Sequence, residues 1–163
     1  MLLYPKEYIN SVKEITINFV EKYNLKGLIL DVDNTLIDYY KKMPDGINEW
    51  AEEMKKAGIK LYILSNSNKK EKVEAVAKKL NIEYINFAKK PFKTGFLKIK
   101  KIMDLNSENI GVVGDQIFTD VLGANRCKMF SILVRPIDEK DIFITKFNRF
   151  LEKIIIKKYL KNK

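Results

Sequence analysis

Acidic and polar side chains follow four short apolar stretches of this sequence, in a combination that could transfer a phosphoryl group. They form the segments Asp31-Val32-Asp33-Asn34-Thr35, Ser65-Asn66, Lys89-Lys90-Pro91 and Gly114-Asp115-Gln116, the last continued by Thr119-Asp120. One carboxylate can attack phosphorus and form an acyl-phosphate, while a second donates and accepts the proton. A lysine and a hydroxyl can hold the phosphoryl oxygens as charge develops on them. Together the four segments predict phosphoester chemistry.

The two aspartates of the first segment have distinct predicted roles. Asp31 is the candidate nucleophile, and Asp33 is the candidate general acid and base. Two carboxylates would repel a phosphate dianion, so this chemistry needs a hard cation, and Mg²⁺ suits carboxylate and phosphate oxygens. The predicted magnesium site consists of Asp31, Asp33, Asp115 and Asp120. Within it Asp31 and Asp115 are the main side-chain ligands, and Asp120 either binds the metal or orients a ligand. The predicted phosphate-binding residues are Ser65, Asn66 and Lys90.

Each segment has an ordinary structural explanation when it is taken alone. Asp, Asn and Thr are common in turns, and Asn34 suits a left-handed backbone conformation. Ser65 can cap a following helix, and the residues themselves do not distinguish Lys90 from Lys89. The functional interpretation rests on the four segments occurring in order, each directly after a predicted strand.

An alternation of short and long apolar patterns predicts an α/β fold that would bring these segments together. The predicted strands are Gly27–Val32, Lys60–Leu64, Tyr84–Phe87, Asn109–Val113 and Ser131–Val134. The predicted helices are, approximately, Pro5–Tyr23, Gly46–Ala57, Lys69–Leu80, Phe92–Met103, Phe118–Cys127 and Asp141–Leu160. This alternation predicts a Rossmann-like three-layer sandwich around a parallel sheet of about five strands, with ligands at the carboxyl ends of the strands. The 163 residues, without repeats or linkers, are expected to form a single domain, residues 1–163.

Composition narrows the function classes. The chain has no histidine and one cysteine, Cys127, which excludes histidine-dependent triads and an internal disulfide. Its apolar runs are too short to cross a bilayer and its start lacks a signal-peptide pattern, so we expect a cytoplasmic location. The net charge of +10 could suggest nucleic acid, but only three of the 31 basic residues are arginine, which readers of bases and phosphates favour. We expect no nucleic-acid partner, and attraction to anionic substrates or lipid surfaces stays open.

The ordered segments resemble the four motifs of the haloacid dehalogenase superfamily of phosphatases. Longer stretches resemble the bacterial YqeG family over nearly the whole chain, namely Leu30–Leu36, Ala88–Pro91, Gly114–Arg126 and Phe143–Arg149. That family belongs to the subclass III phosphatases and is similar to the mitochondrial phosphatidylglycerophosphate phosphatases.

The resemblance implies roles for individual residues. It makes Asp31 the nucleophile, Asp33 the acid and base, and Asp115 a magnesium ligand, and it assigns phosphate binding to Ser65 and Lys90. It also selects Lys90, next to Pro91, over Lys89. An acid at Asp33 favours a phosphatase over a dehalogenase. Gln116 stands where many superfamily members carry a second acid, which leaves open whether Asp120 touches the metal.

The spacing of the motifs predicts an uncapped site. Only 29 residues separate Thr35 from Ser65, and these must hold a loop, a helix and a strand. We therefore expect no cap domain and a site open to large phosphorylated substrates, such as a phospholipid headgroup.

The predicted last helix, about 141–160, is basic and amphipathic. From Asp141 to Lys163 the chain has seven basic residues and two acidic ones, and Phe143, Phe147, Phe150 and Ile154 share one helical stripe. Such a helix can make peripheral contact with an anionic membrane, here the inner face, or pack on the sheet with its lysines solvated, and the sequence leaves both open. Together with the family resemblance it makes phosphatidylglycerophosphate the preferred substrate. The alternatives are a soluble phosphatase of sugar or nucleotide phosphates and a non-catalytic binding or scaffold protein.

Overall fold

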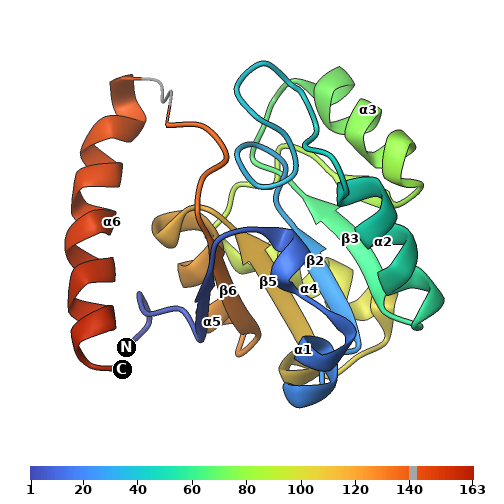
Figure 1. Ribbon diagram of the computed structural model, residues 1–163, viewed down its shortest axis with the longest axis horizontal. Coiled ribbons are helices and arrows are strands. Elements are labelled where there is room, and N and C mark those ends of the chain that lie inside the picture. The colour runs from blue at the N-terminus through green and yellow to red at the C-terminus, as the bar shows by residue number, and fades with distance from the viewer. Residues whose placement is uncertain (140–142) are drawn as a thin grey trace.

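A six-stranded parallel sheet lies at the centre of the computed structural model, which describes residues 1–139 and 143–163 (Figure 1). Its strands are β1 (Glu7–Ile9), β2 (Gly27–Leu30), β3 (Lys60–Leu64), β4 (Glu83–Ile85), β5 (Ile110–Gly114) and β6 (Phe130–Val134). They lie in the order β1-β6-β5-β2-β3-β4, and every neighbouring pair is parallel. The predicted parallel α/β sheet is confirmed.

Helices cover both faces of this sheet. They are α1 (Ile17–Lys22), α2 (Ile47–Lys56), α3 (Lys70–Leu80), α4 (Lys93–Met103), α5 (Leu122–Arg126) and α6 (Phe143–Lys161). Successive side chains of β2 point to opposite faces, so Leu28 and Leu30 join the core under α2 and α3 whereas Ile29 joins the core under α4 and α5. α6 stands beside the β1–β6 end of the sheet (Figure 1), where Ile155 and Ile156 pack near Leu133.

The prediction of one helix over Pro5–Tyr23 is wrong. That segment contains β1, a 3₁₀ turn at Val12–Glu14, and the short helix α1. Ser11 and Glu14 form a capping box at the turn, and Thr16 caps α1, so side-chain hydrogen bonds interrupt the helix at two points. β1 pairs with β6, with Tyr8 opposite Leu133, which adds a sixth strand to the sheet.

Two later helices also differ from their predicted form. The predicted helix Phe118–Cys127 is a π-helical turn at Ile117–Val121 that continues into α5. The predicted start of the last helix, Asp141, lies outside the described residues. Within the described residues, no helix combines the length and the apolar character that crossing a bilayer requires.

The strand order fixes where a ligand can bind. The chain runs outward from β2 to β3 and β4, and then returns to the other side of β2 for β5 and β6. In parallel sheets the crevice for ligands opens where the order reverses, at the carboxyl ends of the strands. Here that point lies between β2 and β5, with Leu30 opposite Val113. Asp31 and Asp115 therefore lie next to each other, at the carboxyl ends of β2 and β5.

Candidate active site

The loop after β2 turns sharply and presents the aspartates of the first segment. The Asp31 backbone N–H still donates to the Val113 carbonyl at 2.9 Å, so β5 fixes the start of the loop. Asn34 has a φ of 58°, the left-handed conformation expected of it. Its side-chain oxygen accepts a hydrogen bond from the Asp138 N–H at 3.1 Å, and its carbonyl accepts one from the Ile137 N–H at 3.1 Å. The segment after β6 thus braces this loop.

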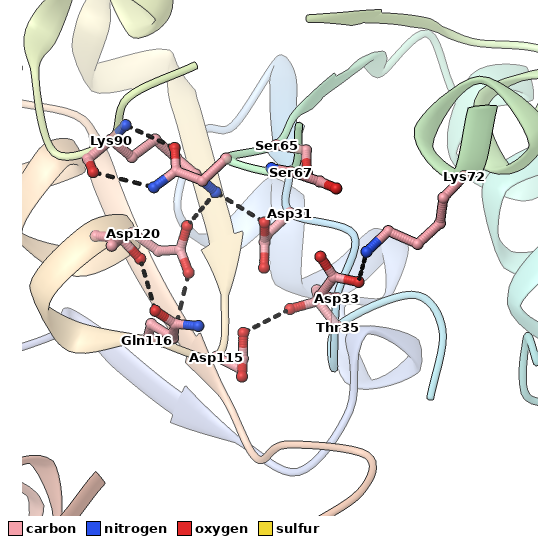
Figure 2. A network of polar contacts seen from close by, with 12 residues as sticks. Asp31, Asp33, Thr35, Ser65, Ser67, Lys72, Lys90, Asp115, Gln116 and Asp120 are labelled. Carbon is pink, nitrogen blue, oxygen red and sulfur yellow. Dashed lines mark hydrogen bonds and ion pairs between the residues drawn. The ribbon is translucent and has the colours of Figure 1, made fainter. Parts of the chain in front are cut away.

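Lys90 bridges two carboxylates of the site (Figure 2). Its Nζ donates to Asp31 Oδ1 at 2.8 Å and to Asp120 Oδ1 at 2.6 Å, and all three side chains are nearly or fully buried. Burial disfavours the charged ammonium, but Asp120 and Asp31 outweigh this and raise the pKa of Lys90, so it stays protonated. Lys89 instead places its ammonium 5.4 Å from the centre of the Phe87 ring. The structure thus places Lys90, not Lys89, in the site.

Asn66 holds the backbone of Lys90. Its side-chain oxygen accepts from the Lys90 N–H at 2.6 Å, and its amide nitrogen donates to the Lys90 carbonyl at 3.1 Å. The predicted direct contact of Asn66 with phosphate stays a prediction, because both ends of its amide are engaged with Lys90. Ser65 is fully buried, and its Oγ accepts from the Ser67 N–H at 3.1 Å. Its hydroxyl proton remains a donor for a ligand.

Asp115 is held from two sides. Thr35 donates to its Oδ1 at 3.4 Å, and Arg149 of α6 contacts its Oδ2 and donates to its backbone carbonyl at 2.6 Å. Arg149 also bonds to Glu152 at 3.0 Å, and Glu152 accepts from the Ile117 N–H at 2.7 Å. The last helix is therefore connected directly to the carboxylate that follows β5.

Three carboxylates converge in the site. Oxygens of Asp31, Asp115 and Asp120 all lie within 4.8 Å of one another. Burial raises the pKa of Asp115 well above its ordinary value, with the charge of Asp31 adding to the effect and Arg149 opposing it. Burial likewise raises the pKa of Asp120 to about 6, although Lys90 opposes the shift. Three buried carboxylates against two cations leave a net negative charge, which favours a bound cation.

The donor set fits a hard divalent cation. Carboxylate oxygens are the ligands that Mg²⁺ takes in proteins, usually a few of them together with water and substrate oxygens. Asp31, Asp115 and Asp120 supply one oxygen each within a shared space. The carboxylate of Asp33, which was predicted to join them, does not belong to this group.

Asp33 points to the rim of the site. Its carboxylate is 47% exposed and accepts a hydrogen bond from Lys72 of α3 at 2.7 Å (Figure 2). This exposure suits the predicted acid–base role of Asp33, because such a group must exchange protons with a leaving oxygen and with water. Asp33 thus lies beside the buried trio rather than inside it.

Gly114 allows the closest contact in the site. A Cβ at this position would lie 2.1 Å from the carboxyl carbon of Asp120, a separation that no side chain could keep. The residue before Asp115 must therefore be glycine if Asp120 is to reach Lys90.

Sequence reasoning missed Lys72, Arg149 and Glu152 as parts of the site. Lys72 is one lysine among many and carries no signal of its own. Arg149 did carry one, because it is among only three arginines and ends the stretch Phe143–Arg149 that resembles the YqeG family.

The fold and the site define a phosphatase of the haloacid dehalogenase superfamily, subclass III. The fold matches that of a cobalt-bound deoxy-D-mannose-octulosonate 8-phosphate phosphatase from Haemophilus influenzae, with a TM-score of 0.58 and 17% identity, over 84% of this chain and 90% of that one. A family model described as mitochondrial PGP phosphatase matches residues 1–137. The chain belongs to this family.

Two curated relatives agree with this assignment. The chain is 40% identical to the probable phosphatase YqeG of Bacillus subtilis over 153 residues, 93% of this chain and 88% of that protein. It is 25% identical to the phosphatidylglycerophosphate phosphatase 1 of Arabidopsis thaliana over 168 residues, covering 96% of this chain and 48% of that protein. The protein is therefore a phosphoric monoester hydrolase of the YqeG type.

Proposed function

We propose that the protein hydrolyses the terminal phosphomonoester of phosphatidylglycerophosphate in a magnesium-dependent reaction, through a phosphorylated Asp31. The observation that carries the chemistry is the buried bridge of Lys90 between Asp31 and Asp120, beside Asp115. This arrangement supports the proposal, because a carboxylate, a buried ammonium and further carboxylate oxygens lie together at the switch point of the sheet.

The reaction proceeds in two displacements on phosphorus. An oxygen of Asp31 forms a bond to phosphorus while the bond from phosphorus to the ester oxygen breaks, and Asp33 gives its proton to the departing alcohol. Asp33 then takes a proton from a water molecule whose oxygen attacks phosphorus. The bond from phosphorus to Asp31 breaks, and inorganic phosphate leaves with Asp31 restored.

The remaining residues bind and orient. Lys90 and the hydroxyl of Ser65 hold the phosphoryl oxygens, and Asn66 fixes the backbone of Lys90. Asp31, Asp115 and Asp120 would hold Mg²⁺. When bound, it would offset the charge of the phosphoryl oxygens and carboxylates.

The choice of a lipid substrate is supported by the family and by the surface of α6. Phe147, Phe150 and Ile154 of the predicted apolar stripe are 68%, 61% and 42% exposed, so these side chains do not pack on the sheet. For Phe143 the structure describes the backbone and not the side chain. The packed side of α6 instead carries Glu152 and Tyr159. An exposed apolar stripe flanked by lysines is suited to an anionic lipid surface, so we place the protein peripherally on the inner membrane face.

The decisive assay measures phosphate release from phosphatidylglycerophosphate in detergent micelles, with Mg²⁺ or EDTA, beside glycerol 3-phosphate as a soluble ester. Wild type should prefer the lipid and need Mg²⁺. Asp31→Asn should abolish turnover, whereas Asp104→Asn, an exposed aspartate at the end of α4, should not. Acid quenching with labelled substrate should trap phosphoprotein in the wild type and in Asp104→Asn, but not in Asp31→Asn. Turnover confined to soluble esters would reject the lipid and keep the chemistry.

Membrane contact has its own test. Sedimentation with vesicles containing an anionic phospholipid should carry the wild type down, and the double variant Phe147→Ser with Phe150→Ser should stay in solution. Ile102→Ser, which removes a 53% exposed side chain on α4, serves as the matched control. Equal sedimentation of all three proteins would reject α6 as the contact surface.

A further inference from the structure

A groove of about 900 Å³ runs beside α6 and opens into the site at Asp115. Its walls come from α6, from the end of β6 with the residues that follow, and from Tyr8 of β1. Ligand sites for small molecules commonly have volumes of about 300–1,000 Å³. No step of the proposed chemistry uses this space, although Arg149 and Glu152 line it next to the reacting groups.

The groove is cationic along one side. Arg135, Lys146, Lys153 and Lys157 line it together with Arg149. In the part of the chain that the structure describes, no carboxylate forms an ion pair with Lys146, Lys153 or Lys157. Asp115 and Glu152, two of the three acidic lining residues, are themselves paired with Arg149. The groove therefore attracts an anion in addition to the phosphoryl group in the site.

The groove is also apolar along its length. Leu133, Ile137, Ile156 and Leu160 contribute to its lining, and Ile137 and Leu160 are 38% and 55% exposed. Along α6 it extends from Lys146 to Leu160, which at the helical rise corresponds to about 21 Å. One leaflet of a bilayer has a hydrocarbon thickness of about 15 Å, half that of the whole core. An acyl chain therefore fits the length of this wall.

We propose that this groove binds the non-reacting half of the substrate, with the phosphodiester against the basic side and the acyl portion along the apolar wall. This assignment rests on the proposed function, and it makes the groove the part of the protein that selects the lipid substrate. A ligand that fills it needs a second negative charge close to the phosphomonoester and an apolar chain beyond it. Sugar phosphates lack that apolar chain. An anionic phospholipid with a phosphorylated headgroup has both features.

The test uses three substrates that share the reacting phosphomonoester. They are phosphatidylglycerophosphate in micelles, its deacylated form in solution, which keeps both phosphates, and glycerol 3-phosphate, which has one. Lys153→Glu should lower kcat/KM about tenfold for the first two relative to the third. Ile137→Ser should lower it about fivefold for the lipid relative to the deacylated compound. Because the deacylated compound forms no micelles, its loss of rate cannot come from weaker binding to an interface.

Matched controls lie on α4, away from the groove. Lys101→Glu and Ile102→Ser change an exposed lysine and an exposed isoleucine there and should leave all three ratios as in the wild type. If the wild type prefers the lipid but both groove variants keep its ratios, the groove assignment is wrong and the proposed function stands. If the wild type does not hydrolyse the lipid, the proposed function fails and the groove assignment fails with it.

Discussion

Arg149 of the last helix donates hydrogen bonds to both the carboxylate and the backbone carbonyl of Asp115, which lies 34 positions earlier in the sequence. Asp115 is fully buried as a side chain, and its neighbours Asp31 and Asp120 carry the same charge. The guanidinium therefore compensates a buried anion in the metal-free protein, and it does so from α6 rather than from a segment that follows a strand.

Arg149→Ala should destabilise the metal-free protein far more than the magnesium-bound one. Removing one partner of a buried ion pair costs about 3–5 kcal/mol, because the other charge is left uncompensated. Mg²⁺ would restore that compensation. Thermal unfolding in EDTA and in Mg²⁺ checks this, with Arg149→Lys as the variant that keeps the charge. An equal loss of Tm in both conditions would show that Arg149 only anchors α6.

Magnesium should stabilise the protein more at pH 7.5 than at pH 5. Folding raises the pKa of Asp120 from 3.8 to about 6, so the ionised form is disfavoured in the folded state. The sign follows: without metal, this residue destabilises the fold above pH 6, and the penalty fades as the pH falls toward 4. The full penalty is about 3 kcal/mol. Mg²⁺ would bind the ionised carboxylate and remove this penalty.

The increase in Tm on adding Mg²⁺, measured from pH 5 to 7.5, tests this linkage. Asp120→Asn has no charge to titrate, so its metal-free Tm should depend less on pH over the same range. A Mg²⁺ effect that is constant with pH in the wild type would contradict the expectation.

Lys72→Met should lower kcat about tenfold through its contact with Asp33. The ammonium lies 2.7 Å from the Asp33 carboxylate and holds its orientation. Loss of the acid itself, in Asp33→Asn, should cost about 10²–10⁴-fold. Steady-state rates of the two single variants and the double variant measure the coupling. If Lys72 acts through Asp33, adding its substitution to Asp33→Asn should change nothing further.

Gly114→Ala should lower both activity and stability. The added Cβ would lie 2.1 Å from the Asp120 carboxyl group, so that side chain must move away from Lys90. Gly111→Ala is the matched control on the same strand, since its Cβ would meet Leu28 at 2.7 Å in the core. Overpacking of that kind costs about 1–3 kcal/mol without touching the site. Gly111→Ala should therefore lower Tm and keep a rate close to that of the wild type, whereas Gly114→Ala should lower both.

Much of the fold can be predicted from the pattern of apolar residues, because most strands and helices are long enough to show the period of their type. The helix α3 buries Val73, Val76, Ala77 and Leu80, as their spacing predicts. β1 has only three residues, too few to show an alternation of apolar and polar side chains. It is a strand because it pairs with β6. Such an element depends on contacts across the chain, which local sequence does not carry.

The site divides in the same way. Residues in the segments that follow strands could be placed from the rule for parallel sheets. The sequence therefore predicts that Asp31, Lys90, Asp115 and Asp120 lie in one site. Lys72 lies on α3 and Arg149 on α6. Which face of each helix points to the site depends on how the helix packs, and the local sequence does not determine that packing. The outward direction of Phe147 and Phe150 is undetermined in the sequence for the same reason.

The strand order has a consequence for synthesis on the ribosome. The strand β2, which precedes Asp31, is made early, but both of its partners in the sheet, β3 and β5, are made later. Asp31 is translated long before Asp115, and Arg149 comes later still. A nascent chain therefore carries Asp31, the proposed nucleophile, through most of translation without the other residues of the site around it. The set of contacts that includes Arg149 is complete only when α6 has been made.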